Sequence, residues 1–137
     1  MRTLDVITRV TDYCPKFAHV GHALTPPEDM EFPAALIAPA KLLADPDSMI
    51  GPVHAQDLDQ TYSIWVILSR KADTDLTSGA EDLDSLCEDL RIALCGWQID
   101  NDHAPMQLAS GQLDKFHTGI VCWREDYSVQ FTLRITP

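Results

Sequence analysis

The chain has 137 residues, of which 45% are hydrophobic and 23% are charged. These are values of an ordinary globular protein, and the length has room for a single domain with one core. Acidic residues outnumber basic ones by 21 to 10, so the net charge is −11. Such a charge repels phosphates and disfavours sequence-specific binding of nucleic acid. No apolar run resembles a secretory signal or a membrane span, so we expect a protein without a membrane partner.

The first predicted elements are one helix and two strands. Leu4, Ile7 and Val10 recur at helical spacing, and Pro15 ends this helix near Tyr13. Residues 16–20 predict a brief strand. After a proline-marked connector at 22–32, the apolar run at 33–39 lies between prolines and predicts a strand at or near a sheet edge.

Residues 39–60 show no periodic pattern and contain three prolines and four aspartates. We expect a long irregular loop here, because a structureless segment of this length in a compact domain is usually functional or mobile. A solvated loop does not require the apolar residues found in it, so we expect 44–59 to be mobile and to order against a neighbouring subunit or partner. The predicted contact residues are Leu42, Leu43, Asp45, Asp47, Met49, Ile50, Val53, Asp57 and Asp59.

The middle of the chain carries the clearest pattern. Five consecutive apolar residues, Ile64–Leu68, predict a strand within 61–70 that lies mid-sheet and is covered on both faces. A helix follows, for which Ser78 and Glu81 have the spacing of a capping box and Gly96 is placed as terminator. Its apolar stripe consists of Leu83, Leu86, Cys87, Leu90 and Leu94, and its opposite, solvated face carries Asp82, Asp84, Glu88, Asp89 and Arg91.

The last third of the chain predicts an antiparallel meander. Residues 105–110 are expected to form a strand, 111–116 a turn into another, and 118–126 to lead into the final pairing. Apolar and polar residues alternate from Tyr127 to Ile135, as in a strand with one buried face. Glu125 and Asp126 are expected to form a tight reversal before that strand.

The loop at 95–105 holds the residues most easily mistaken for a chemical site. Asp100, Asn101, Asp102 and His103 lie between the end of the second helix and the next strand. They lack the paired ligand spacing of a zinc site and the ligand order of a calcium loop, so a solvated turn is the preferred interpretation.

Other candidate metal ligands are weaker still. His19 and His22 are three residues apart in a weak strand or turn, where that spacing does not converge on an ion, and the aspartates of 45–59 lack the order of a calcium-binding loop. We therefore expect no metal and no other cofactor. The four cysteines, Cys14, Cys87, Cys95 and Cys122, show no CxxC pair and are expected to be reduced and mostly buried. No hydrolase, phosphate-binding or dinucleotide-binding motif is present, and we expect no catalytic residue.

Three stretches carry a resemblance to a known family. They are the helix-to-Gly-Trp junction at Leu90–Trp97, the Gly111-Gln112-Leu113 turn, and the aromatic final segment Trp123–Ile135. In these stretches and in element order, the chain resembles the tail terminator proteins of long-tailed bacteriophages, also called tail completion proteins. The resemblance implies an α+β subunit in which two main helices cover one face of a mostly antiparallel sheet.

The resemblance also implies a function. Such subunits form a homohexameric ring that stops growth of the tail tube and joins the tail to head-completion or connector proteins. A structural component of the virion tail, assembled in the cytoplasm of the bacterial host, needs no catalytic residues. The alternative is a small α+β enzyme or ligand-binding domain with a pocket under the 39–60 loop. A sixfold ring supports the first reading, and a monomer with a deep apolar pocket supports the second.

Overall fold

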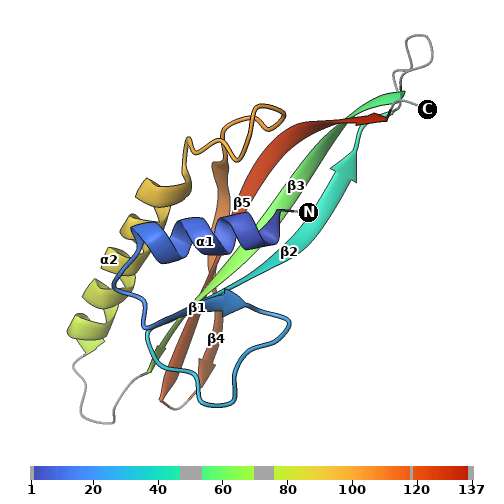
Figure 1. The fold of residues 1–137 in the computed structure, drawn as a ribbon. Coiled ribbons are helices and arrows are strands. Elements are labelled where there is room, and N and C mark those ends of the chain that lie inside the picture. Colours follow the sequence, from blue (N-terminus) through green and yellow to red (C-terminus); the bar gives the residue numbers. More distant parts are fainter. Residues whose placement is uncertain (1, 47–53, 70–75, 118, 136–137) are drawn as a thin grey trace.

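A computed structural model describes residues 2–46, 54–69, 76–117 and 119–135 of the chain. Two helices lie against a mixed sheet of five strands in the order β1-β2-β3-β5-β4 (Figure 1). Only β1 and β2 pair in parallel, and the three other pairings are antiparallel. The predicted α+β class is therefore confirmed. The elements are α1 Thr3–Tyr13, β1 His19–His22, β2 Ala34–Ala44, β3 His54–Ser69, α2 Leu76–Leu94, β4 Gln107–His117 and β5 Ile120–Ile135.

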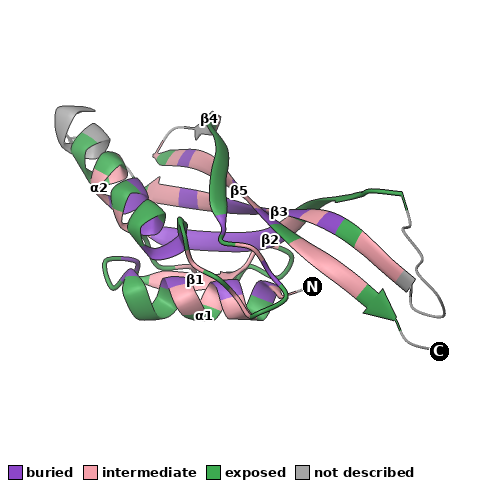
Figure 2. Ribbon diagram, turned by 90° about the horizontal axis from the view of Figure 1, so that it is seen from above, coloured by how far each residue is buried: buried purple, intermediate pink, exposed green. Residues whose placement is uncertain are grey.

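Both helices pack on one face of the sheet and share a single core with it. Ile37 of β2 is paired with Ile64 of β3, and Tyr62 of β3 with Tyr127 of β5, so these side chains point to the same face. They join the buried residues of both helices in one apolar cluster. Figure 2 shows that the buried positions concentrate where the strands lie beside the helices. No helix in the described part of the chain is both long and apolar enough to span a membrane.

The first helix has the predicted bounds but a different buried face. Val6 and Val10 are fully buried, whereas Leu4 is 74% exposed. Apolar residues at 4, 6, 7 and 10 form two overlapping helical stripes, one that starts at Leu4 and one that starts at Val6. We predicted that the first would be buried, but the helix buries the second. The brief strand predicted at 16–20 exists, three residues later, as β1. The strand predicted at 33–39 is β2, which lies next to the edge strand as expected.

The second helix buries the predicted stripe. Leu86, Cys87, Leu90 and Leu94 are buried, and Leu83 packs against the core from a partly buried position. Gly96 follows the helix with a φ of 82°, the left-handed conformation that ends helices at glycine. The helix begins at Leu76, however, so the predicted capping box, with its N-cap at residue 78, lies within it rather than at its start.

The predicted central strand lies mid-sheet as expected, but only one of its two faces is covered. β3 is the middle strand of the sheet, and Ile64 and Val66 are fully buried under the helices. Trp65 and Ile67 point to the other face, which no helix covers in the described part of the chain, and both are partly exposed. One face of the sheet therefore remains open around them.

The long irregular loop predicted at 39–60 is largely wrong. β2 continues past Pro39 to Ala44, and β3 already begins at His54. A register shift between Pro39 and Lys41 accommodates the proline, which cannot donate a hydrogen bond to its neighbour. Of the predicted contact residues, Asp47, Met49, Ile50 and Val53 lie outside the described residues. The others belong to or directly follow strands.

The C-terminal meander is also wrong in detail, because it is one long hairpin. β4 runs through the predicted turn at 111–116, and β5 runs through Glu125 and Asp126 without the predicted reversal. Gly111 is not a turn residue: a side chain there would lie 3.0 Å from the ring of Trp123, so the glycine makes room for this ring. The β4–β5 pairing has two register shifts, between Leu108 and Ser110 and between Leu113 and Lys115, of the kind that bend and twist a strand.

The long strands produce a projection that we call the arm. It consists of three segments: residues 39–46, which are the end of β2 and the two residues after it, residues 54–61 of β3, and residues 128–135 of β5. These three strand ends extend together away from the helices, and β5 ends near the C-terminus at the far end of the arm (Figure 1). β1 pairs with β2 only as far as Ile37, so the arm carries its strands beyond the helix-covered part of the sheet.

Candidate interaction surface

The arm exposes large apolar side chains on both of its faces. Leu42 is 53% exposed, Leu43 is 54% exposed and Ile135 is 53% exposed. Leu42 is paired with Gln60 and points to the helix side of the sheet, whereas Leu43 is paired with Asp59 and points to the other side. Apolar residues gathered on a projecting element mark a contact surface more often than a solvated one. The arm is therefore the candidate interaction surface of the chain.

A groove lies on the face of the arm opposite the helices. It has a volume of about 360 Å³, and residues of β2, β3, β5 and the loop before β4 line it. A smaller depression of about 90 Å³ adjoins it and shares Asp59, Ala104 and Gln130 with it. We call the two together the arm groove. The main part is lined by Leu43, Asp45, Asp57, Leu58, Asp59, Asp102, Ala104, Gln130, Phe131 and Thr132.

Four carboxylates give the arm groove its charge. Three of them, Asp45, Asp57 and Asp59, are among the residues predicted as partner contacts, and the fourth is Asp102. Asp57 accepts a hydrogen bond of 2.9 Å from Thr132 Oγ1, and none of the four forms an ion pair with another described residue. The part of the chain that the structure describes holds no group of His, Cys, Asp or Glu side chains able to bind a metal ion. The carboxylates are thus spread along the groove.

The loop at 95–105 forms one wall of the arm groove. It connects α2 to β4 as predicted, but it is not simply a solvated turn. The side chain of His103 is only 9% exposed and stacks on Phe131 of β5, with ring centroids 4.8 Å apart. His103 also forms an isolated β-bridge with Phe131, and the Ala104 amide donates to the Gln130 carbonyl at 2.7 Å. The loop is therefore fastened to the free edge of β5.

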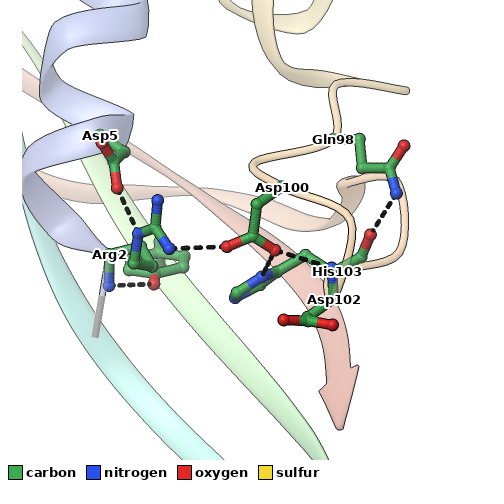
Figure 3. A network of polar contacts seen from close by, with 7 residues as sticks. Arg2, Asp5, Gln98, Asp100, Asp102 and His103 are labelled. Atoms are coloured by element: carbon green, nitrogen blue, oxygen red, sulfur yellow. Dashed lines mark hydrogen bonds and ion pairs between the residues drawn. The ribbon is translucent and has the colours of Figure 1, made fainter.

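A polar network fixes the same loop to the start of α1 (Figure 3). Asp100 Oδ1 lies 2.6 Å from His103 Nδ1, and Asp100 Oδ2 accepts a hydrogen bond of 2.6 Å from Arg2. Arg2 also pairs with Asp5, and its backbone amide donates to the Tyr62 hydroxyl at 3.0 Å. The hydrogen bond with His103 is the main reason why the pKa of Asp100 is lowered from its ordinary value of 3.8. The aspartate accordingly keeps its negative charge in this network.

A second network lies in the body of the sheet, and no sequence pattern indicated it. Glu125 is fully buried and accepts hydrogen bonds from Arg91 Nη2 at 2.5 Å, Tyr127 Oη at 2.8 Å and Trp123 Nε1 at 3.2 Å. Burial and the nearby carboxylate raise the pKa of Tyr127 far above its ordinary value, so the phenol stays a neutral donor. Arg91, predicted to lie on a solvated helix face, thus ties α2 to β5. These groups are all satisfied by one another, and the network is structural.

The remaining sequence candidates do not converge on a site. His19 and His22 lie in β1, where residues three apart point to opposite faces. All four cysteines are free, and Cys14, Cys87 and Cys122 are buried whereas Cys95 is exposed. Burial is the main reason why the pKa of Cys14 is raised to about 11 and that of Cys87 to about 12. Neither thiol is an activated nucleophile.

These observations describe an α+β subunit whose polar clusters are structural and whose exposed features lie on a projecting arm. The family model described as phage tail terminator protein matches residues 2–137. The chain belongs to the phage tail terminator protein family. No curated protein matches the chain. Membership supports a structural role in the phage tail and confirms the resemblance that the sequence carried.

The structure places the predicted contact residues on both faces of the arm. The structure brings Leu43, Asp45, Asp57 and Asp59 together in the arm groove, and it places Leu42 on the opposite face of the arm. The sequence reasoning missed Asp102, Gln130, Phe131 and Thr132, which come from two segments remote from 39–60. The alternation of Gln130, Thr132 and Arg134 with apolar residues did predict one polar face of β5. Nothing local indicated that this face adjoins the aspartates of β3.

Proposed function

We propose that this protein is a structural, non-enzymatic tail terminator whose subunits form a homohexameric ring. The ring caps the tail tube and joins it to the head-completion or connector protein, and it assembles in the cytoplasm of the bacterial host before it becomes part of the virion tail. The observation that carries the proposal is the match of residues 2–137 to the family model. Self-association and the two protein partners are parts of the proposal that the family match favours.

The arm supplies a physical reason for self-association. A closed ring requires a heterologous contact, in which one patch of a subunit meets a different patch of the next. Leu42, Leu43 and Ile135 project on a sheet extension that the subunit itself leaves uncovered. Burying such side chains against a neighbour stabilises the contact by about 1.5–3 kcal/mol for each fully buried residue. We assign the subunit or partner contact to the arm, with Asp45, Asp57 and Asp59 at its polar side.

The net charge of −11 fits the same role. DNA leaves a phage head through the tail, and an acidic ring offers no electrostatic attraction to its phosphates. The expectation that the chain binds no nucleic acid sequence-specifically follows from this charge.

The proposal is tested by the oligomeric state and by tail termination. Sedimentation and negative-stain microscopy of the purified chain should show a sixfold ring whose population grows with concentration. A double Leu42→Asp, Leu43→Asp variant should remain folded by circular dichroism but lose the ring, and phage tails assembled with it should vary in length. Leu24→Asp is the matched control, because Leu24 is 75% exposed but lies in the connector after β1 rather than on the arm. A concentration-independent monomer, or rings that persist in the double variant, contradicts the assignment.

A further inference from the structure

The arm groove has the shape of a site for a linear ligand. Its two parts share Asp59, Ala104 and Gln130, so they form one channel that continues along β3 and β5 toward the start of β4. Leu58 and Phe131 are paired with each other and point to the helix side of the sheet, so Leu43 is the large apolar side chain that faces the groove. A channel of this form accommodates an extended peptide, whose aliphatic side-chain stems pack on apolar surface while their charged ends reach the walls.

The charged groups that line the arm groove are all acidic. Asp45, Asp57, Asp59 and Asp102 line it, and among the described residues no Lys, Arg or His side chain does. The Oδ1 atom of Asp59 is shielded from solvent and has no hydrogen-bond partner among the described residues. A carboxylate oxygen buried without a donor is costly, and a docked cationic donor that reorients this side chain removes the cost. This atom indicates, independently of the groove's overall charge, that a donor is missing from its surroundings.

The spacing of the carboxylates defines the ligand further. Asp57 and Asp59 are two residues apart on β3 and point to the same face, because their partners in β5 are Thr132 and Gln130. Two residues along a strand span about 7 Å. The same distance separates alternate side chains of an extended peptide, so Lys or Arg residues at alternate positions match these carboxylates in register.

The wall of the arm groove is fixed before any ligand binds. Asp102 and Ala104 belong to the loop that the Arg2–Asp100–His103 network and the His103–Phe131 stack hold in place. A preformed wall lowers the entropy cost of binding, because the loop does not have to order on the ligand. The loop therefore presents its carboxylate in a defined position.

A second copy of this chain is poorly suited as the occupant. Most of its described basic side chains are already engaged with acidic, carbonyl or aromatic groups, namely Arg2, Arg9, Lys16, Arg91 and Arg124. Lys41 and Arg134 are exposed, but they are single charges on the arm itself. With 21 acidic against 10 basic residues, a second copy offers few free cations that could fill the arm groove.

We propose that the arm groove is the docking site for an extended, lysine- or arginine-bearing segment of a partner protein. The inference rests on the proposed function for the existence of a partner in the assembled tail, and it adds the chemistry by which this partner is held. The segment lies along β3 with alternate basic side chains directed at Asp57 and Asp59, and their stems pack on Leu43.

The test uses the full chain and the peptide Lys-Ala-Lys-Ala-Lys-Ala-Lys-Ala as the probe. Titration of isotope-labelled protein should shift the amide resonances of Ala104, Gln130 and Thr132 first. A double Asp57→Asn, Asp59→Asn variant should bind the peptide about tenfold more weakly, as expected for the loss of two partly exposed ion pairs. The matched control is Asp82→Asn with Glu88→Gln, which removes the same charge from the exposed face of α2. It should weaken binding less than about twofold, because it changes only the long-range field.

The outcomes separate this inference from the proposed function. Equal weakening in the two double variants, or resonance shifts spread over the whole surface, overturns the docking site even if the protein forms rings. Failure of the wild-type chain to form rings overturns the ring proposal but leaves a localised peptide response in support of the groove. Arg70 and Lys71 are the one adjacent basic pair in the sequence. If their replacement by glutamine disturbs ring assembly as strongly as the groove variant does, the occupant is a second copy and the inference is wrong.

Discussion

The buried network around Glu125 makes a sharp prediction about Arg91. Replacing Arg91 by methionine leaves a fully buried carboxylate with only the neutral donors Trp123 and Tyr127. Removing one partner of a buried ion pair typically costs about 3–5 kcal/mol. Because the Arg91 side chain is 46% exposed, water partly replaces it, and we expect the lower end of this range. The free energy of unfolding should fall by about 3 kcal/mol, which for a chain of this length lowers the melting temperature by roughly 12 °C.

Two further variants separate the charge from the contact. Glu125→Gln keeps the shape and accepts the remaining hydrogen bonds, so it should cost only about 1 kcal/mol. The double variant Arg91→Met, Glu125→Gln should be more stable than Arg91→Met alone, because it leaves no unpaired charge in the core. Glu88→Gln on the exposed face of α2 is the control and should change stability by less than about 0.5 kcal/mol.

Urea unfolding followed by circular dichroism measures all four free energies. The reasoning is refuted if Arg91→Met is as stable as the Glu88→Gln control, or if the double variant is less stable than both single variants. The first result would mean that the Arg91–Glu125 ion pair contributes little to stability, and the second that the cost does not come from an unpaired Glu125 carboxylate.

Burial and pKa lead to four other predictions. Leu90→Asp should unfold the domain, because Leu90 is fully buried, whereas Glu88→Ala should leave the melting temperature within about 2 °C. Iodoacetamide at pH 9 should label Cys95 of the folded chain, whereas Cys87, with a pKa raised to about 12 by burial, should react only on unfolding. Because of this raised pKa, Cys87 loses its thiol proton at a lower pH in the unfolded chain than in the folded one. Its contribution to the free energy of unfolding is therefore fully present below about pH 9 and is lost as the pH rises toward 12. Asp100 has a lowered pKa, so its contribution is present above its ordinary value of 3.8 and is lost as pH falls through the lower folded value. Asp100→Asn should therefore speed hydrogen exchange in residues 98–104 at neutral pH.

The sequence predicted the elements whose cause is local. The stripe of α2 lies within one helix and has a period of 3.6 residues, and Gly96 ends that helix because of its own backbone freedom. Ile64–Leu68 is apolar throughout, which identifies a central strand without any knowledge of its neighbours. In each of these cases the residues that form the pattern are also those that form the element.

The strand β5 shows where local reasoning failed. Val121, Trp123, Tyr127 and Val129 occupy alternate positions on the helix side of the sheet, and Glu125 stands in the middle of this series. Because Glu125 is charged, we interpreted its position as part of a turn rather than as a core position of a strand. Its burial depends on Arg91, which is 34 residues away in the sequence. A strict reading of the period of two from 121 to 135 would have predicted one long strand and left Glu125 as a buried charge that needs a partner.

The arm failed as a prediction for a different reason. Gln56, Leu58 and Gln60 alternate with Ala55, Asp57 and Asp59, so both faces of this stretch are polar and no apolar period appears. It is a strand because it pairs with the whole C-terminal half of β5 and, on its other side, with the end of β2. Sheet pairing supplies the hydrogen bonds that a solvated loop would make to water, and it does so without an apolar signal.

A polar strand on a projecting arm has a consequence for how its acidic residues act. In an irregular loop, Asp57 and Asp59 would be independently hydrated and would present no fixed geometry. On β3 they share one face at a strand spacing, beside Thr132 of β5 and the fastened loop that carries Asp102. Repulsion among these carboxylates is retained in the folded subunit, because none of them has an ion-pair partner in the described part of the chain. Like charges held in register weaken a fold slightly, but they bind a partner of opposite charge with little reorganisation. This is the behaviour expected of a surface whose charges are paired only when a partner binds.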